Sequence, residues 1–219
     1  MLAIEGGFLD RREAGRRLAN ELAKTKWADP IVLALPRGGV PVAFEIAKAL
    51  HAPLDILLVR KIGAPEHPEF GVGAVVDGND PQLLLNDDAL RMLGISSDYI
   101  EKEETRQLHE IERRRERYLG GRAAIPVEHR TAIVVDDGIA TGSTAAVALK
   151  AVQKSGAART VLAVPVAPPE VIHTLRAEAD EVVCLSTPAQ FQTVGSYYVD
   201  FEQTSDEEVV ELLHAAEEI

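Results

Sequence analysis

Short apolar runs alternate with segments of helical periodicity along most of the chain, and this alternation constrains the fold more than any other feature. Five runs have strand character: 31–35, 54–60, 131–137, 159–166 and 181–185. The segments 40–50, 142–155 and 168–178 between them have helical periodicity. Strands that alternate with helices of this length predict right-handed crossovers. We therefore predict an α/β fold with a mostly parallel central sheet and helices on both faces.

The remaining segments add elements around this sheet. Helices are predicted over 8–26, over 97–119 and from Ser205 or Asp206 to the end of the chain. Residues 61–73 contain two prolines and three glycines, which favours a mobile loop. Residues 74–85 resemble a hairpin with its turn near 77–80.

The helix predicted over 97–119 is almost entirely polar. Asp98 followed by Glu101 resembles a capping box at its start. A narrow apolar stripe runs along it, formed by Ile100, Leu108, Ile111 and Tyr118. The stripe is typical of a solvated helix with one packed seam, or of a dimer contact or a lid, and from it we expect a homodimer.

The length of 219 residues suits one domain that contains an insertion. We predict a single domain over 1–219, a helical insertion over 86–120 and a small hood over 186–204.

Composition excludes several classes of protein. A formal net charge of -12 disfavours nucleic acid as a partner, because phosphates are repelled. The single cysteine, Cys184, leaves no disulfide framework and fits a reducing compartment. The first residues lack the apolar core of a signal peptide, and no run is long enough to span a membrane. We expect a cytoplasmic protein without a membrane partner. The histidines and the cysteine show no ligand spacing, so no metal site built from protein side chains is expected.

The stretch IVVDDGIATGST, residues 133–144, places unusual chemistry after a predicted strand. Gly138 and Gly142 allow a ligand to approach the backbone, and the helix that follows offers unpaired N–H groups to an anion. Neither a P-loop nor a GxGxxG pattern is present. Asp136 and Asp137 precede this cradle, where they would repel a phosphate unless they bound something between, such as the two hydroxyls of a ribose. An Asp pair that only caps a helix and forms a turn is the alternative.

This stretch resembles the phosphoribosyl pyrophosphate (PRPP) signature of type I phosphoribosyltransferases, and the resemblance extends over about residues 28–185. Within that family the chain is similar to a small prokaryotic group that has no assigned acceptor. The resemblance implies that Asp136 and Asp137 hold the ribose hydroxyls and favour positive charge on the sugar. It implies a cradle for the 5′-phosphate formed by Gly138, Ile139, Ala140, Thr141, Gly142, Ser143 and Thr144.

The same resemblance assigns the LPRGG stretch, residues 35–39, to the pyrophosphate of PRPP. Arg37 would grip the diphosphate beside Gly38 and Gly39, and a strained or cis Pro36–Arg37 peptide is expected. Its alternative is an ordinary turn with an exposed arginine.

Arg60 and Lys61 would belong to a flexible loop that closes over PRPP, with Lys61 taking part in catalysis. The alternative interpretation is that this segment is a mobile surface loop without a catalytic role. Enzymes for 6-oxopurines carry an acid at the position of Ala140, so a general base would come from this loop, for which we name Glu69. Phe191 and Tyr197 are candidates for stacking on the acceptor, with core packing as the alternative.

The resemblance therefore implies an enzyme of the phosphoribosyltransferase (pentosyltransferase) type, acting in nucleotide metabolism such as purine or pyrimidine salvage. It would move the phosphoribosyl group of PRPP to a nitrogenous acceptor, with Mg²⁺ held through PRPP oxygens and water. A PRPP-binding regulator without turnover is the alternative. PRPP synthesis is disfavoured because no separate nucleotide motif is present, and a serine hydrolase because GxSxG is absent.

Overall fold

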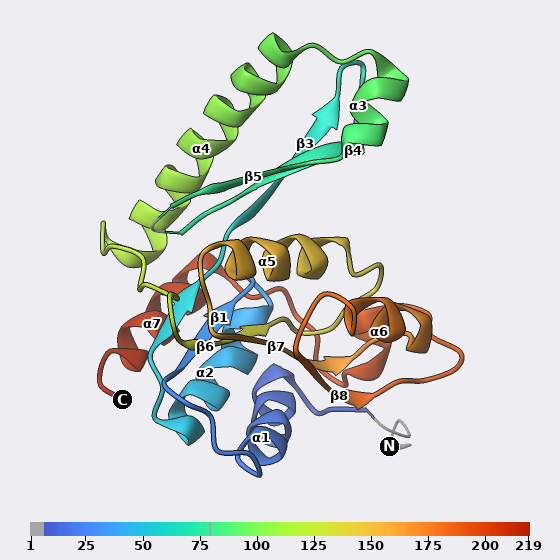
Figure 1. The fold of residues 1–219 in the computed structure, drawn as a ribbon. Coiled ribbons are helices and arrows are strands. Elements are labelled where there is room, and N and C mark those ends of the chain that lie inside the picture. The colour runs from blue at the N-terminus through green and yellow to red at the C-terminus, as the bar shows by residue number, and fades with distance from the viewer. Residues whose placement is uncertain (1–6, 79) are drawn as a thin grey trace. The chain divides into compact units, whose positions relative to one another are not determined.

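The computed structural model describes residues 7–78 and 80–219, apart from the side chain of Glu69. The chain divides into two compact units. The first, which we call the core unit, contains the chain up to Ile56 and the segment Val127–Ile219. The second, the inserted unit, is Leu57–Pro126. Figure 1 shows the elements of both, and each unit is described by itself.

The core unit contains a five-stranded parallel sheet with the strand order β2-β1-β6-β7-β8. Its inner strands are runs of Ile, Val, Leu and Ala with almost no exposed surface, as expected for a sheet covered on both faces. The predicted α/β class and mostly parallel sheet are confirmed. The strands are β1 (Pro30–Ala34), β2 (Leu54–Ile56), β6 (Thr131–Val135), β7 (Arg159–Val166) and β8 (Glu181–Ser186).

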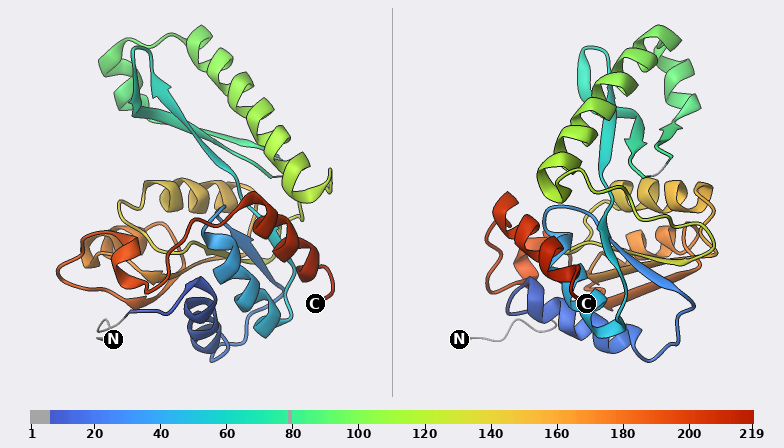
Figure 2. Two further views of the ribbon diagram at one scale, coloured as in Figure 1. Left: turned by 180° about the vertical axis from the view of Figure 1, so that it is seen from behind. Right: turned by 90° about the vertical axis from the view of Figure 1, so that its left-hand side faces the viewer.

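Helices cover both faces of this sheet (Figures 1 and 2). One face carries α1 (Arg11–Leu22) and α2 (Gly39–Leu50), which pack closely on each other, and α7 (Asp206–Ala216) packs against α2. The other carries α5 (Ser143–Lys154) and α6 (Pro169–Leu175). Right-handed crossovers that run in opposite directions from the middle of the sheet place the helices in this way.

The direction in which successive strands are added to the sheet reverses between β1 and β6, although all the strands are parallel. From β1 the chain crosses to β2 on one side, whereas β6 leads to β7 and β8 on the other. β1 and β6 are paired over their whole length, and the N–H of Leu35 extends the pairing by donating to the carbonyl of Val135 at 2.8 Å. The loops that follow both strands therefore start side by side, at the point where open α/β sheets bind ligands.

The inserted unit is an antiparallel three-stranded sheet with two helices. This corrects two predictions: the apolar run over 54–60 is not one strand, and 61–73 is a hairpin, not a loop. The N–H of His67 donates to the carbonyl of Pro65 at 2.8 Å to close the turn, and the strand register shifts around Gly63. Proline and glycine thus mark a tight turn and a bulge. The elements are β3 (Val59–Ala64), β4 (His67–Val76), β5 (Gln82–Leu85), α3 (Asp87–Leu93) and α4 (Ser97–Leu119).

The long helix α4 has the predicted bounds but a different cap. The Ser96 hydroxyl accepts from the N–H of Tyr99 at 3.3 Å, so Ser96, and not Asp98, is the N-cap. Ile100, Ile111 and Tyr118 of the apolar stripe are buried, and α4 packs on β3 and β4. The stripe is therefore used inside the inserted unit, and the homodimer stays a prediction.

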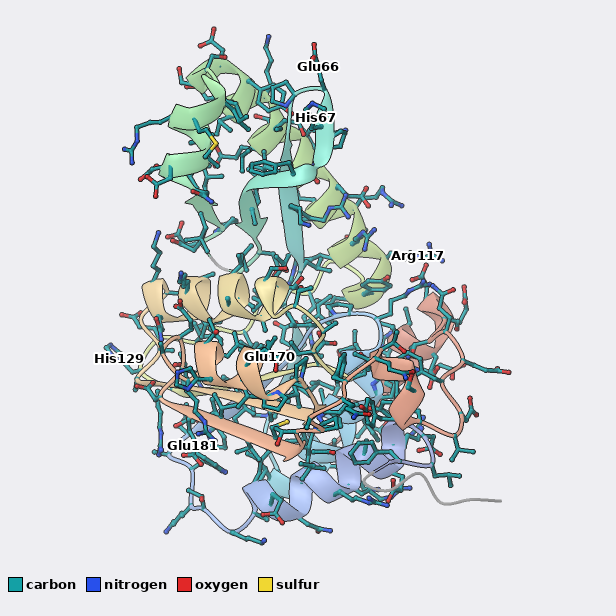
Figure 3. The ribbon with its side chains drawn as sticks, turned by 90° about the vertical axis from the view of Figure 1, so that its right-hand side faces the viewer. Glu66, His67, Arg117, His129, Glu170 and Glu181 are labelled. Carbon is teal, nitrogen blue, oxygen red and sulfur yellow. The ribbon has the colours of Figure 1, made fainter. Side chains whose placement is uncertain are left out.

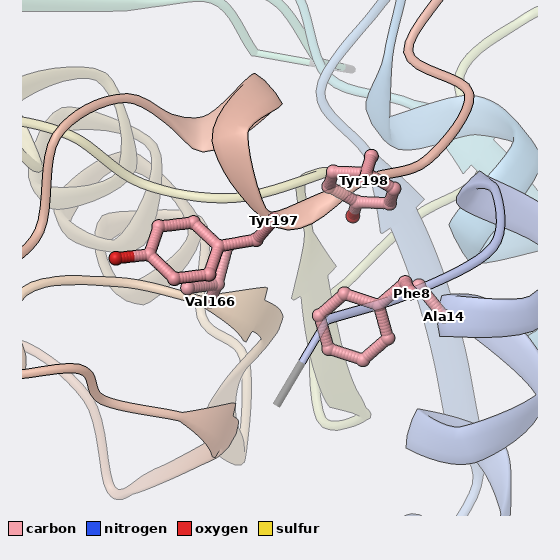
Figure 4. Close-up of a cluster of buried hydrophobic side chains, with 5 residues drawn as sticks. All are labelled: Phe8, Ala14, Val166, Tyr197 and Tyr198. Carbon is pink, nitrogen blue, oxygen red and sulfur yellow. The ribbon is translucent and has the colours of Figure 1, made fainter. Parts of the chain in front are cut away.

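The segment before α1 is paired with the segment that precedes α7. Phe8 donates its N–H to the carbonyl of Tyr197 at 2.7 Å and accepts from the N–H of Val199 at 2.9 Å. Side chains of these two segments, of α1 and of β7 form the buried cluster of Figure 4: Phe8, Ala14, Val166, Tyr197 and Tyr198. Within the described residues, no helix has the length and hydrophobicity needed to cross a membrane.

Close packing of α1 on α2 gives a test of the core unit. A methyl group on Gly15 would lie 2.7 Å from the carbonyl oxygen of Val42. We expect Gly15→Ala to lower the free energy of unfolding by about 1–3 kcal/mol, because overpacking outweighs the gain in helix propensity. Urea denaturation measures it. Asn20→Ala, at an exposed position of the same helix, should stay within about 0.5 kcal/mol of the parent. Equal effects of the two changes would contradict the packing argument.

Candidate active site

The loop after β1 lies directly against the end of β6. A Cβ atom on Gly39 would stand 2.7 Å from the carbonyl oxygen of Val135 and 3.1 Å from the Cα of Asp136. A Cβ on Gly38 would overlap the carboxylate of Asp137. The two glycines are therefore what allows this close approach. The Pro36–Arg37 peptide that leads into them is cis, which confirms that prediction.

The two adjacent acids are held in different ways. Asp136 Oδ1 accepts from the backbone N–H of Asp137 at 2.8 Å. Burial, followed by the charge of Asp137, raises the pKa of Asp136 well above its usual range. Burial also raises the pKa of Asp137, and this rise is opposed by the neighbouring guanidinium of Arg11. The protein thus keeps two carboxylates in a site that disfavours their charge.

Arg11, the first residue of α1, is the partner that sequence reasoning missed. Its Nε donates to Asp137 Oδ2 at 2.8 Å, and its Nη1 donates to the backbone oxygen of Glu202 at 2.6 Å. The guanidinium carbon also lies 3.9 Å from the ring centroid of Phe201. Only 12% of the Arg11 side chain is exposed. A single arginine 126 positions away from Asp137 leaves no local pattern that could have identified it.

Tyr198 is a second contact of the acid pair. Its hydroxyl donates to the backbone oxygen of Asp137 at 2.5 Å. Burial and the charge of Asp137 raise the pKa of this hydroxyl, so it stays a donor at neutral pH.

The predicted phosphate cradle forms a turn that ends in α5. Gly138 and Gly142 have φ values of 153° and 78°, which other residues rarely adopt. The N–H of Ile139 donates to the carbonyl of Val166, so this group supports the turn. Thr141 and Ser143 are exposed, and their hydroxyl oxygens lie 3.3 Å apart. The turn therefore offers hydroxyl groups and the first N–H groups of α5 to an anion.

The other predicted residues of the core unit have partners of their own. Arg37 lies near α7, with its Nη1 3.8 Å from Asp206 Oδ1. Phe191 and Tyr197 stack on each other at 5.5 Å, and the Tyr197 hydroxyl donates to the carbonyl of Gln190. Tyr197 is only 8% exposed. The structure thus places this pair in a packed cluster, and its role in acceptor binding stays a prediction.

The predicted residues of the inserted unit are divided between the two faces of β3. Arg60 turns towards α4, where its Nε donates to Gln107 Oε1 at 3.0 Å. Lys61, the next residue, is exposed, and its side chain crosses Gly71 of β4. The alternation of a strand accounts for this separation. Glu69 is the predicted base, but its side chain lies outside the described residues.

The turn of the β3–β4 hairpin carries two of the polar residues that accompany Glu69 in the sequence. Glu66 and His67 are exposed there, and Figure 3 shows both at the end of the hairpin. They contribute to a pocket of about 440 Å³ inside the inserted unit, bounded on its other side by residues of the α3–α4 connection and by Tyr99.

The comparison with known proteins decides the family. The model of the phosphoribosyl transferase domain matches residues 9–201. The chain belongs to this family. Two Mycobacterium tuberculosis proteins named "Putative phosphoribosyl transferase", from strains CDC 1551 and H37Rv, are each 50% identical over 209 residues. This match covers 95% of the chain but only 47% of each relative, so the chain spans about half of their length.

A solved structure supports the same fold. The protein TT1426 from Thermus thermophilus is 46% identical, with a TM-score of 0.83. The match covers 94% of this chain and 97% of that one. The family fold predicted from the sequence is therefore confirmed.

The raised pKa of Asp136 predicts a gain in stability when its charge is removed. A carboxyl whose folded-state pKa is raised destabilises the fold once pH exceeds its unfolded value, because the native state resists ionisation. We expect Asp136→Asn to raise the free energy of unfolding by about 1 kcal/mol at pH 8, and by less at pH 5. Chemical denaturation at both pH values measures this.

Asp180 supplies the control, because hydrogen bonds from Thr160 hold the pKa of Asp180 below its usual value. Asp180→Asn should lower stability at neutral pH, and its effect should shrink in acid. A loss of stability on Asp136→Asn at pH 8 would contradict the electrostatic argument.

Proposed function

We propose that this chain transfers the 5-phosphoribosyl group of PRPP to a nitrogenous acceptor, with release of pyrophosphate. One observation carries the proposal. At the point where the strand order reverses, the acid pair and the glycine turn before α5 belong to one loop, and Arg37 with the two glycines after it belongs to the adjoining loop. This combination suits a ligand that has a diol between two phosphate-bearing ends.

In the proposed reaction, a nitrogen lone pair of the acceptor attacks C1 of the ribose while the bond from C1 to the pyrophosphate oxygen breaks. Pyrophosphate leaves with the electron pair, and the acceptor loses its proton to a base or to water. Asp136 and Asp137 accept from the ribose hydroxyls and stabilise the positive charge that develops on the sugar. The turn from Gly138 to Thr144 holds the 5′-phosphate. Arg37 binds the pyrophosphate together with a backbone N–H of its loop, where Gly38 and Gly39 give room.

Magnesium enters the proposal through the substrate. Among the described residues, no group of three His, Cys, Asp or Glu side chains could hold a metal ion. The donors that fit Mg²⁺ are the oxygens of PRPP and water, because this ion keeps much of its hydration shell. When bound there, Mg²⁺ neutralises charge on the leaving pyrophosphate.

The acceptor is proposed as a nucleobase, which places the protein in nucleotide metabolism such as purine or pyrimidine salvage. Ala140 stands where 6-oxopurine enzymes carry an acid, which favours another class of base. Phe191 and Tyr197 remain the candidates for contact with the acceptor, and Glu69 the candidate for its base. A cytoplasmic homodimer completes the proposal. A PRPP-binding regulator is the second candidate, favoured by a binding loop that would serve equally without turnover.

Pyrophosphate release tests the reaction. PRPP, Mg²⁺ and a panel of nucleobases should give release that needs one base. The double variant Asp136→Asn/Asp137→Asn should lose at least about 100-fold in rate, because charge stabilisation on the sugar is removed. The double variant Asp87→Asn/Asp88→Asn, which alters an exposed adjacent pair on α3, should keep the parental rate. PRPP binding without release for any base would favour the regulator, and absence of PRPP binding would overturn the proposal.

Arg60 and Lys61 lie on opposite faces of β3, and this predicts different effects when each is replaced. Lys61→Ala should lower kcat/KM for PRPP by about 10- to 100-fold, with the unfolding transition unchanged, because Lys61 is exposed and would contact the substrate. Arg60→Ala should destabilise the inserted unit, because it removes the bond to Gln107. Steady-state kinetics and thermal unfolding of both variants test this. A kinetic loss confined to Arg60→Ala would reverse the assignment.

A further inference from the structure

Arg11 occupies a position that helix stability does not explain. It is the first residue of α1, at the positive end of the helix dipole, where a cation is unfavourable. Asp10 provides the N-cap and Glu13 the acid of the first turn, so the helix start is formed without Arg11.

Burial of the Arg11–Asp137 ion pair is a second reason to expect a role for Arg11 other than stabilising the fold. The side chains of Arg11 and Asp137 are 12% and 15% exposed. A pair that is largely removed from water contributes little net stability, because desolvation offsets the attraction between the charges. The contact is nevertheless well formed, with an N–O distance of 2.8 Å.

The geometry around Arg11 joins three parts of the candidate active site. Its Nε bonds Asp137, and it would lie 3.3 Å from a Cβ on Gly38 of the pyrophosphate loop. Its Nη1 and the face of its guanidinium contact Glu202 and Phe201, which lie near the end of the predicted hood segment 186–204. One side chain thus holds the second acid against the loop predicted for pyrophosphate.

We propose that Arg11 is a positioning residue for PRPP, which fixes the carboxylate of Asp137 in the ionised form that the ribose diol needs. This inference rests on the proposed function. Asp137 Oδ2 is bonded to Arg11, Asp136 Oδ1 is bonded to the N–H of Asp137, and the two carboxyl groups also interact with each other. A bound diol would replace the contact between the two carboxyl groups, with one hydroxyl donating to each acid.

Loss of Arg11 acts on Asp137 through its charge. The groups that face Asp137 are the neighbouring Asp136, Arg11 from α1 and the Tyr198 hydroxyl, and Glu13 acts on that hydroxyl. Arg11 is the cation among these groups, and the glycines of the β1–α2 loop add no charge. Without it, the raised pKa of Asp137 rises further. The carboxyl then carries a proton over a wider pH range, and a neutral carboxyl is a weaker acceptor for a ribose hydroxyl than a carboxylate.

The experiment measures the dissociation constant of PRPP by calorimetry between pH 5.5 and 8.5, for the parent, Arg11→Gln and Arg11→Lys. Arg11→Gln should weaken binding at least 10-fold at pH 7, and the defect should shrink as pH rises and Asp137 loses its proton. Arg11→Lys should recover part of the affinity. Arg16→Gln is the matched control on α1, because Arg16 is 54% exposed and faces Glu45. It should bind PRPP as the parent does.

A double-mutant cycle separates positioning from a general loss of structure. In an Asp137→Asn background, Arg11→Gln should cause no further loss of affinity, because Arg11 acts through that carboxylate. Additive losses, or an Arg11→Gln defect that does not change with pH, would overturn the inference while parental PRPP binding upholds the proposed function. If Arg11→Gln lowers the melting temperature, Arg11→Lys and the cycle still decide. Absence of PRPP binding by the parent would overturn both.

Discussion

Parallel pairing of β1 with β6 is the constraint on which the candidate active site depends. The two strands run in register to their ends, so the loops that follow them have no room to diverge at once. A Cβ on Gly39 would meet the backbone of the other loop, and a Cβ on Gly38 would overlap the carboxylate of Asp137, so a side chain at either position would prevent this close approach. The acid pair and the glycine turn then belong to one loop, and the basic residue after the cis peptide belongs to the other. The order of the strands thus places both loops where one ligand can contact them together.

Contacts from the start of α1 and from the segment that precedes α7 complete the candidate active site at the edge of the sheet. Phe8 pairs with the backbone on either side of Tyr198, and this pairing brings the start of α1 beside the carboxyl-terminal segment. Arg11 then reaches Asp137 from α1, and Tyr198 reaches the same residue from the other segment. The site therefore depends on a long-range closure of the chain as much as on its central strands, which explains why these contacts connect residues far apart in the sequence.

Much of the core unit could be predicted, because each buried strand is a short apolar run and each helix between strands has its own periodicity. The candidate site at the DD…TGST stretch could be recognised in the sequence because its unusual residues are contiguous. The β3–β4 hairpin was missed, since proline and glycine mark a tight turn and a bulge as readily as a loop. Ser96 was passed over as the cap because Asp98 fits the same rule. Arg11 could not be found, because a long-range ion pair follows from the fold and not from any local pattern.

The electrostatics of the acid pair connect these observations. Burial raises the pKa of both carboxyls, so the site disfavours the charges that would stabilise a sugar cation in the proposed reaction. Arg11 opposes this effect at Asp137, and the N–H of Asp137 opposes it at Asp136. The buried acid pair thus lowers the stability of the fold, and the N–H of Asp137 and the guanidinium of Arg11 limit this loss. Charges held in this way need little rearrangement when positive charge appears on the substrate, which is the physical basis of electrostatic preorganisation.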